Sequence, residues 1–134
     1  MKILLDTHIL LWAITNDIQL PENAKKMILN ADNDIFFSTI SVLEVQLKHI
    51  AHPDSLPIDG ERFLNYCKQS GFAMLHLKCE PIFLLKTLER YPGRPPHKDP
   101  FDRLLICQAI DENMIFVTHD NLLGDYNVPN IIKV

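Results

Sequence analysis

The segment KILLDTHILLW, residues 2–12, contains two apolar runs that are separated by one acid. Residues 2–5 are too few for an amphipathic helix, and they suit a strand that is covered on both faces, as in parallel sheets. Asp6 follows this strand directly, and residues 7–15 have the pattern of a helix. A strand that leads through one acid into a helix predicts an α/β fold.

The same alternation continues along the chain. Further compact apolar runs predict strands at residues 35–38, 72–77, 115–118 and 131–134. Helix-like patterns lie between them at residues 21–30, 42–49, 59–70, 81–88 and 100–112. This order predicts a three-layer α/β/α sandwich with a mostly parallel central sheet.

Size and composition favour one globular domain over residues 1–134. The chain is 47% hydrophobic and 22% charged, which is ordinary for a folded protein. The segment PGRPP at residues 92–96 predicts a stiff surface loop, because too little chain follows it for an independent fold. The apolar runs are too short for a membrane span or a signal core, so we expect a cytoplasmic protein without a membrane partner.

Several other kinds of site are disfavoured by the sequence. Cys67, Cys79 and Cys107 are odd in number and lack CxxC spacing, which predicts reduced, buried thiols. His49 and His52 are the closest histidine pair, and they lack the cysteine or acid that a zinc site needs. The glycines never form the GxxxxGK[ST] pattern of a phosphate-binding loop.

Carboxylates stand where predicted strands or helices begin or end. Asp6 follows the first strand directly, and Asp120 follows the strand at residues 115–118 by two residues. Functional groups of open α/β sheets gather beyond the carboxyl ends of the strands, so both acids should lie at one edge. Glu44 and Asp102 would reach that edge from helix N-termini. We therefore predict one pocket that contains all of these acids.

Helix capping is a competing explanation for some of them. The segment SVLE at residues 41–44 fits a capping box, which would make Glu44 a cap. The segment DPFD at residues 99–102 places Asp99 at an N-cap and Asp102 at the third helical position. Asp120 could cap its own turn, whereas a buried Asp6 needs a cation or several donors, such as the amides that open the helix at Thr7. One metal site explains all the acids together.

Convergence of these carboxylates predicts a bound cation. Two carboxylates ~4 Å apart repel by about 4 kcal/mol at an effective dielectric near 20. Hard oxygen ligands select Mg²⁺ or Mn²⁺ over zinc. Such an ion polarises a phosphoryl oxygen and helps to ionise an attacking water, so the expected reaction is phosphodiester hydrolysis.

The charge distribution restricts how nucleic acid could bind. A net charge of -4 argues against nonspecific coating of nucleic acid, which needs clustered cations. Five cations nevertheless lie within residues 86–103, just before or beside Asp102: Lys86, Arg90, Arg94, Lys98 and Arg103. They are either a solvated surface or a rim that binds phosphates, and Arg94, Lys98 and Arg103 are the candidate substrate contacts.

Four segments resemble the successive signatures of PIN-domain ribonucleases, most closely the VapC-type toxins of prokaryotic toxin-antitoxin pairs. They are LLDTHILLW at residues 4–12, SVLEV at 41–45, HKDPFDRLLI at 97–106 and VTHD at 117–120. They cover nearly the whole chain in the family's order, and the first and third are the specific ones. Leu43 departs from the tryptophan that often precedes the second acid in this group.

The resemblance implies a role for each acid. Asp6, Glu44, Asp102 and Asp120 would be the catalytic, metal-binding quartet around Mg²⁺ or Mn²⁺, and the substrate would be single-stranded or looped RNA. Thr7 and Thr118 would support the site by hydrogen bonding. Asp99 would reach the metal through water or only cap its helix. A cognate antitoxin and a homodimer are the expected protein partners.

Two alternatives remain open at this point. One is a receiver-like signalling domain in which Asp6 or Asp102 is phosphorylated, although a paired acid after the first strand is missing. The other is a catalytically silent PIN module that binds RNA or protein. His8 and His119 would flank the acidic edge, and Trp12 is expected to pack the first helix against the core.

Overall fold

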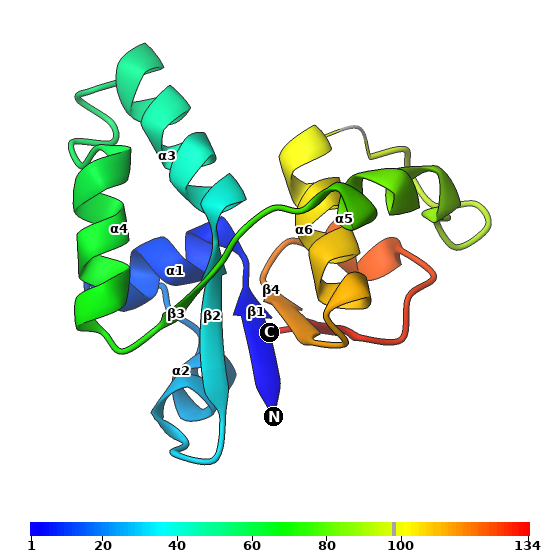
Figure 1. Cartoon of the computed structure of the whole chain (residues 1–134), viewed down its shortest axis with the longest axis horizontal. Helices are drawn as coiled ribbons and strands as arrows, with labels where there is room; N and C mark the ends of the chain where they lie inside the picture. Colours follow the sequence, from blue (N-terminus) through cyan, green and yellow to red (C-terminus); the bar gives the residue numbers. More distant parts are fainter. Residues whose placement is uncertain (98) are drawn as a thin grey trace.

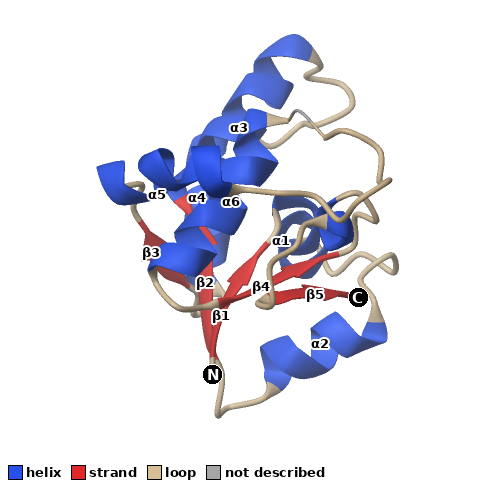
Figure 2. Cartoon of the chain, turned by 90° about the vertical axis from the view of Figure 1, so that its right-hand side faces the viewer, coloured by secondary structure: helices blue, strands red, loops and turns tan. Residues whose placement is uncertain are grey.

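The computed structural model describes residues 1–97 and 99–134 (Figure 1). Lys98, one of the candidate RNA contacts, lies outside the described residues. Five strands form one sheet: β1 (Lys2–Leu5), β2 (Asp34–Ser38), β3 (Ala73–Leu75), β4 (Ile115–Thr118) and β5 (Ile131–Lys133). They lie in the order β3-β2-β1-β4-β5, and every neighbouring pair is parallel (Figure 2).

Helices occupy the connections between the strands. They are α1 (Thr7–Ile14), α2 (Glu22–Leu29), α3 (Thr39–Ala51), α4 (Gly60–Gln69), α5 (Cys79–Leu84) and α6 (Pro100–Asp111), with single 3₁₀ turns at η1 (Leu85–Thr87) and η2 (Leu123–Asp125). Helix α3 lies beside α4, and α5 lies beside α6 (Figure 1). None of the described helices has the length and apolar character that a membrane span requires.

Side chains alternate across the sheet and form two cores. On one face Leu5 and Phe37 pack with buried residues of α1, α2 and α4, among them Phe63. On the other face Leu4 and Phe116 pack with buried residues of α6. Strands covered on both faces have the continuous apolar runs that the sequence contains. The prediction of a three-layer α/β/α sandwich is confirmed.

The order of the strands creates a switch point between β1 and β4. From β1 the chain builds outward through β2 to β3, and it then returns to the other side of β1 for β4 and β5. The backbone N–H of Asp6 donates to the Val117 carbonyl at 3.0 Å, so the ends of β1 and β4 are joined there. Ligands of open α/β sheets bind in the crevice beyond such a point.

The predicted capping box at residues 41–44 is wrong. Helix α3 begins at Thr39, directly after β2, and its N-cap is Ser38, whose Oγ accepts a hydrogen bond from the Ile40 N–H at 3.0 Å. Ser41 and Glu44 therefore lie within the helix, where both are buried. Because Glu44 does not cap α3, helix capping no longer explains why an acid stands at this position.

Two smaller predictions also differ from the structure. Strand β3 is shorter than residues 72–77, because the Leu77 N–H bonds to the Thr39 hydroxyl at 3.2 Å and not to a neighbouring strand. Cys79 is exposed, whereas burial raises the pKa of the Cys67 thiol to about 12 and that of Cys107 to about 11. Only two of the three cysteines are therefore the buried thiols that were expected.

Candidate metal centre

Asp6 stands at the switch point, between strand β1 and helix α1. Its Oδ1 accepts a hydrogen bond from the Thr7 N–H at 2.7 Å, and its Oδ2 accepts one from the Thr118 hydroxyl at 2.7 Å. Only 4% of the residue is exposed. Burial raises the pKa of Asp6, Glu44 raises it further, and the bonds from Thr118 and Thr7 oppose this effect. A buried carboxyl with this environment favours a nearby cation.

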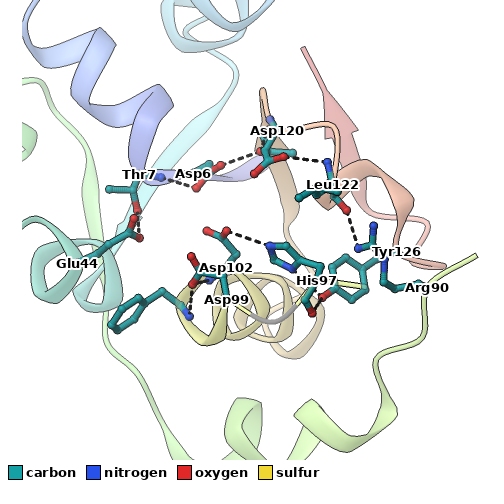
Figure 3. Close-up of polar contacts among 12 residues, drawn as sticks. Asp6, Thr7, Glu44, Arg90, His97, Asp99, Asp102, Asp120, Leu122 and Tyr126 are labelled. Atoms are coloured by element: carbon teal, nitrogen blue, oxygen red, sulfur yellow. Dashed lines mark hydrogen bonds and ion pairs between the residues drawn. The ribbon is translucent and has the colours of Figure 1, made fainter. Parts of the chain in front are cut away.

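Thr118 connects Asp6 to Asp120. The Thr118 hydroxyl donates to Asp6 and accepts a hydrogen bond from the Asp120 N–H at 3.0 Å. Asp120 is exposed, and its Oδ1 accepts from the Leu122 N–H at 2.8 Å, so it does cap its own turn. This turn fixes the direction of the Asp120 carboxylate, which lies across from Asp102 and His97 (Figure 3).

Glu44 approaches the same space from helix α3. Its Oε1 accepts a hydrogen bond from the Thr7 hydroxyl at 3.0 Å, and Thr7 also contacts the Ser41 hydroxyl at 2.8 Å. Its Oε2 forms an ion pair with Lys48 at 2.9 Å, one helical turn further along α3. Thr7 therefore contacts both buried acids, through its backbone N–H to Asp6 and its hydroxyl to Glu44.

Asp102 faces the other acids from the first turn of α6. Asp99 is the N-cap of this helix, and its Oδ1 accepts from the Phe101 N–H at 2.9 Å and the Asp102 N–H at 3.3 Å. Burial, together with the charges of Asp6, Asp99, Glu44 and Asp120, raises the pKa of Asp102 to about 8, and burial is the largest cause. The Asp102 carboxyl therefore interacts electrostatically with the other three acids of the predicted quartet (Figure 3).

His97 is a member of this group that the sequence did not assign. Its Nε2 lies 3.3 Å from Asp102 Oδ2, and only 6% of its side chain is exposed. One ligand atom each from His97, Asp102 and Asp120 lie within 4.8 Å of one another, a grouping that could hold a metal ion. Burial lowers the pKa of His97. The residue opens the HKDPFD segment, but a histidine in a proline-rich loop is no signal of burial.

A cavity of about 280 Å³ lies beside the acids. It is lined by Asp6, His8, Trp12, His119 and Asp120. The rings of Trp12 and His119 are 5.6 Å apart at 70°, and Trp12 is half-buried. Trp12 does pack against the core as predicted. It also presents an aromatic surface next to two of the carboxylates, which the sequence did not indicate.

Comparison with known proteins identifies the family. Residues 3–128 match the PIN domain family. The chain belongs to the PIN domain family. Two solved structures are similar to it: VapBC2 from Rickettsia felis bound to a promoter DNA fragment, and DNA-bound VapBC from Salmonella typhimurium. The first has a TM-score of 0.64 at 20% identity and covers 100% of this chain and 98% of its own. The second has a TM-score of 0.61 at 20% identity, with 100% and 97% covered. A search of curated proteins found no match.

In this PIN domain, Arg94 and Arg103 of the predicted rim already have partners within the protein. Arg103 donates to the Leu85 carbonyl at 3.3 Å and so joins α6 to η1. Arg94 is largely exposed, and its Nε lies 3.8 Å from Asp125 Oδ1. Arg103 therefore has a structural role in holding these two segments together. Contact of these cations with RNA stays a prediction.

The donor set of the PIN domain fits a divalent cation. Asp6 and Glu44 are buried, Asp102 is nearly so, and Asp102 has a ligand atom within 4.8 Å of one on Asp120 (Figure 3). The Lys48 ammonium group balances the charge of Glu44. Burial and the neighbouring acids, in contrast, raise the pKa of Asp102 to about 8. A cation bound among these oxygens would offset their mutual repulsion and favour the ionised form of Asp102.

Proposed function

We propose that this PIN domain is a divalent-metal-dependent endoribonuclease and the toxin of a toxin-antitoxin module. The observation that supports the proposal is the group of acids beside the switch point of the sheet: ligand atoms of Asp102 and Asp120 lie within 4.8 Å of each other, and Thr118 joins Asp120 to Asp6. Two ionised carboxylates ~4 Å apart repel by about 4 kcal/mol at an effective dielectric near 20, so a bound cation would stabilise the ionised group.

Each residue of the site has a role in this proposal. Asp6, Glu44, Asp102 and Asp120 supply oxygen ligands or orient water, as the catalytic and metal-binding quartet. Bound Mg²⁺ or Mn²⁺ would supply Lewis-acid polarisation of a phosphoryl oxygen and acidify a water. Thr118 and Thr7 orient the Asp6 carboxylate through their 2.7 Å bonds. Asp99 fixes the first turn of α6 and thereby the position of Asp102.

The cavity beside the acids supports a single-stranded or looped RNA substrate. Unpaired bases stack on aromatic side chains at a gain of about 1–3 kcal/mol per base. Trp12 and His119 offer such a surface next to Asp6 and Asp120, where the phosphate to be cleaved would lie. Arg94, Lys98 and Arg103 are proposed to bind flanking phosphates, and the net charge of -4 keeps nonspecific binding weak.

Exposed apolar side chains support protein partners. Leu43, Leu47 and Ile50 follow one another along α3 with exposed fractions of 49%, 46% and 66%. Such surfaces commonly contact other proteins. The fold is shared with structures that are named VapBC complexes, so we propose a cognate antitoxin as one partner and a second copy of the chain as another.

An RNA cleavage assay tests the nuclease. Wild-type protein is freed of metal with a chelator and incubated with a structured RNA, single-stranded DNA or duplex RNA while Mn²⁺ or Mg²⁺ is titrated. We expect cleavage within the loops of the RNA, only with metal, and complete loss in Asp6→Asn with the fold retained. Asp54→Asn, an exposed acid outside the site, is the matched control. Equal cleavage without metal, or by Asp6→Asn, contradicts the proposal; binding without cleavage would identify a silent PIN module.

A further inference from the structure

We propose that His97 is a direct nitrogen ligand of the metal in this site, so that the centre is a mixed nitrogen and oxygen site that prefers Mn²⁺ to Mg²⁺. This inference rests on the proposed metal dependence. It assigns a ligand from outside the acid quartet, and it predicts which cation the site selects.

The position of the ring is the first reason. The His97 side chain is 6% exposed, and its Nε2 faces Asp102 Oδ2 at 3.3 Å. Adjacent ligands in an octahedral site with bonds of ~2.1 Å are about 3 Å apart. His97 and Asp102 are therefore already spaced as two ligands of one ion, and a ligand oxygen of Asp120 lies within 4.8 Å of both (Figure 3).

The hydrogen bonds of the ring are the second reason. His97 Nδ1 lies 2.9 Å from the Tyr126 hydroxyl, and that hydroxyl donates its single proton to the His97 carbonyl at 3.4 Å. When the hydroxyl accepts from the ring in this way, Nδ1 carries the proton of the neutral imidazole. In this tautomer Nε2 keeps its lone pair on the side of Asp102 and is free to bind a metal. A cation bound to both Nε2 and the ionised Asp102 carboxylate would link these two atoms at their observed separation of 3.3 Å.

Tyr126 holds this arrangement in place. Its ring packs edge-on against His97 at 5.7 Å, and the Arg90 guanidinium lies 4.8 Å from the ring centroid on its face. Arg90 is itself fixed by the Leu122 carbonyl at 2.7 Å and by Asp125. Histidines that bind metals commonly donate their other ring N–H to such a fixed acceptor, which orients the ring and sets its tautomer.

A nitrogen ligand changes the selectivity of the site. Mg²⁺ strongly favours oxygen ligands, whereas imidazole suits first-row transition metals, and Mn²⁺ accepts both. The ratio of the Mn²⁺ affinity to the Mg²⁺ affinity should therefore be larger in this site than in a site made only of carboxylates. Loss of the imidazole should reduce the affinity for Mn²⁺ by at least ~10-fold, since even residues behind the ligands contribute that much.

Pulsed electron paramagnetic resonance on Mn²⁺-loaded protein tests the inference without any substrate. A directly bound imidazole nitrogen gives ¹⁴N modulation of the Mn²⁺ echo, and labelling the histidines with ¹⁵N must change that modulation. We expect the modulation in wild-type protein and in His76→Phe, an exposed histidine after β3 that serves as the control. His97→Phe keeps an aromatic ring against Tyr126 and should lose the modulation. Titration calorimetry then compares Mn²⁺ and Mg²⁺ affinities in the three proteins.

The outcomes separate this inference from the proposed function. Metal-dependent RNA cleavage together with Mn²⁺ binding that lacks nitrogen modulation would overturn the ligand role of His97 and leave the nuclease intact. That result would mean that the ring contacts Asp102 from outside the coordination sphere. A wild-type protein that binds neither cation would overturn both. Retained modulation in His97→Phe would assign the nitrogen to another residue and also overturn the inference.

Discussion

The raised pKa of Asp102 predicts that the metal-free protein loses stability as the pH rises. Burial and the surrounding acids raise this pKa from 3.8 to about 8. Because the folded-state pKa lies above the unfolded one, the stabilising effect of the protonated carboxyl is full below pH 3.8 and is lost as the pH rises toward 8. Each pH unit in this window costs about 1.4 kcal/mol, so the free energy of unfolding should fall by about 3 kcal/mol between pH 5 and 7.

Asp102→Asn isolates this contribution, because an amide does not titrate. Urea unfolding with a chelator present, at pH 5, 6, 7 and 8, should show a much flatter pH dependence for the variant than for the wild type. The remaining slope would come from Asp6, whose pKa is also raised by burial. Asp111→Asn, at the other end of α6, is the control and should parallel the wild type. If the stability of wild type and of Asp102→Asn depended on pH in the same way, the raised pKa of Asp102 would be refuted.

Three further predictions test the rest of the site. Thr118→Val removes the donor to Asp6 and the acceptor for the Asp120 N–H, so calorimetry should find metal affinity reduced by about 10-fold; unchanged affinity would remove Thr118 from the site. Replacing Arg94 and Lys98 with Gln should reduce the steepness of the plot of log affinity for single-stranded RNA against log salt by about 1.4. An unchanged slope would mean that these two side chains are solvated and do not contact RNA phosphates. Expression of the protein alone should arrest growth, and co-expression of the adjacent gene product should reverse the arrest; normal growth with active, soluble protein would argue against the toxin role.

Most of the fold follows from local sequence patterns. Apolar runs such as Ile3–Leu5 and Phe116–Val117 are buried on alternating faces of the sheet, so their composition predicts covered parallel strands. The order of the strands does not follow from these patterns, because it depends on which helices cover which face. The end of β3 was also missed, since the Leu77 backbone is held by Thr39 from a distant part of the chain.

The acids were easier to predict than their surroundings. Asp6 and Asp120 follow strands that end at one edge of a parallel sheet, so their proximity follows from the fold. Glu44 was ambiguous because its segment resembles a cap, and only the helix start at Thr39 resolves the ambiguity. His97 carries no periodic signal. Its burial depends on Tyr126, which is far away in sequence and packs against the ring.

Anomalous diffraction from Mn²⁺-loaded crystals of the wild-type protein tests the central claim most directly. The account predicts an anomalous peak beyond the ends of β1 and β4, with carboxylate oxygens of Asp6 and Asp102 about 2.1–2.2 Å from the ion or joined to it through one water. Asp6→Asn crystals grown in the same way should show a weaker peak or none. Full Mn²⁺ occupancy elsewhere on the protein, with no peak among these acids, would contradict the account.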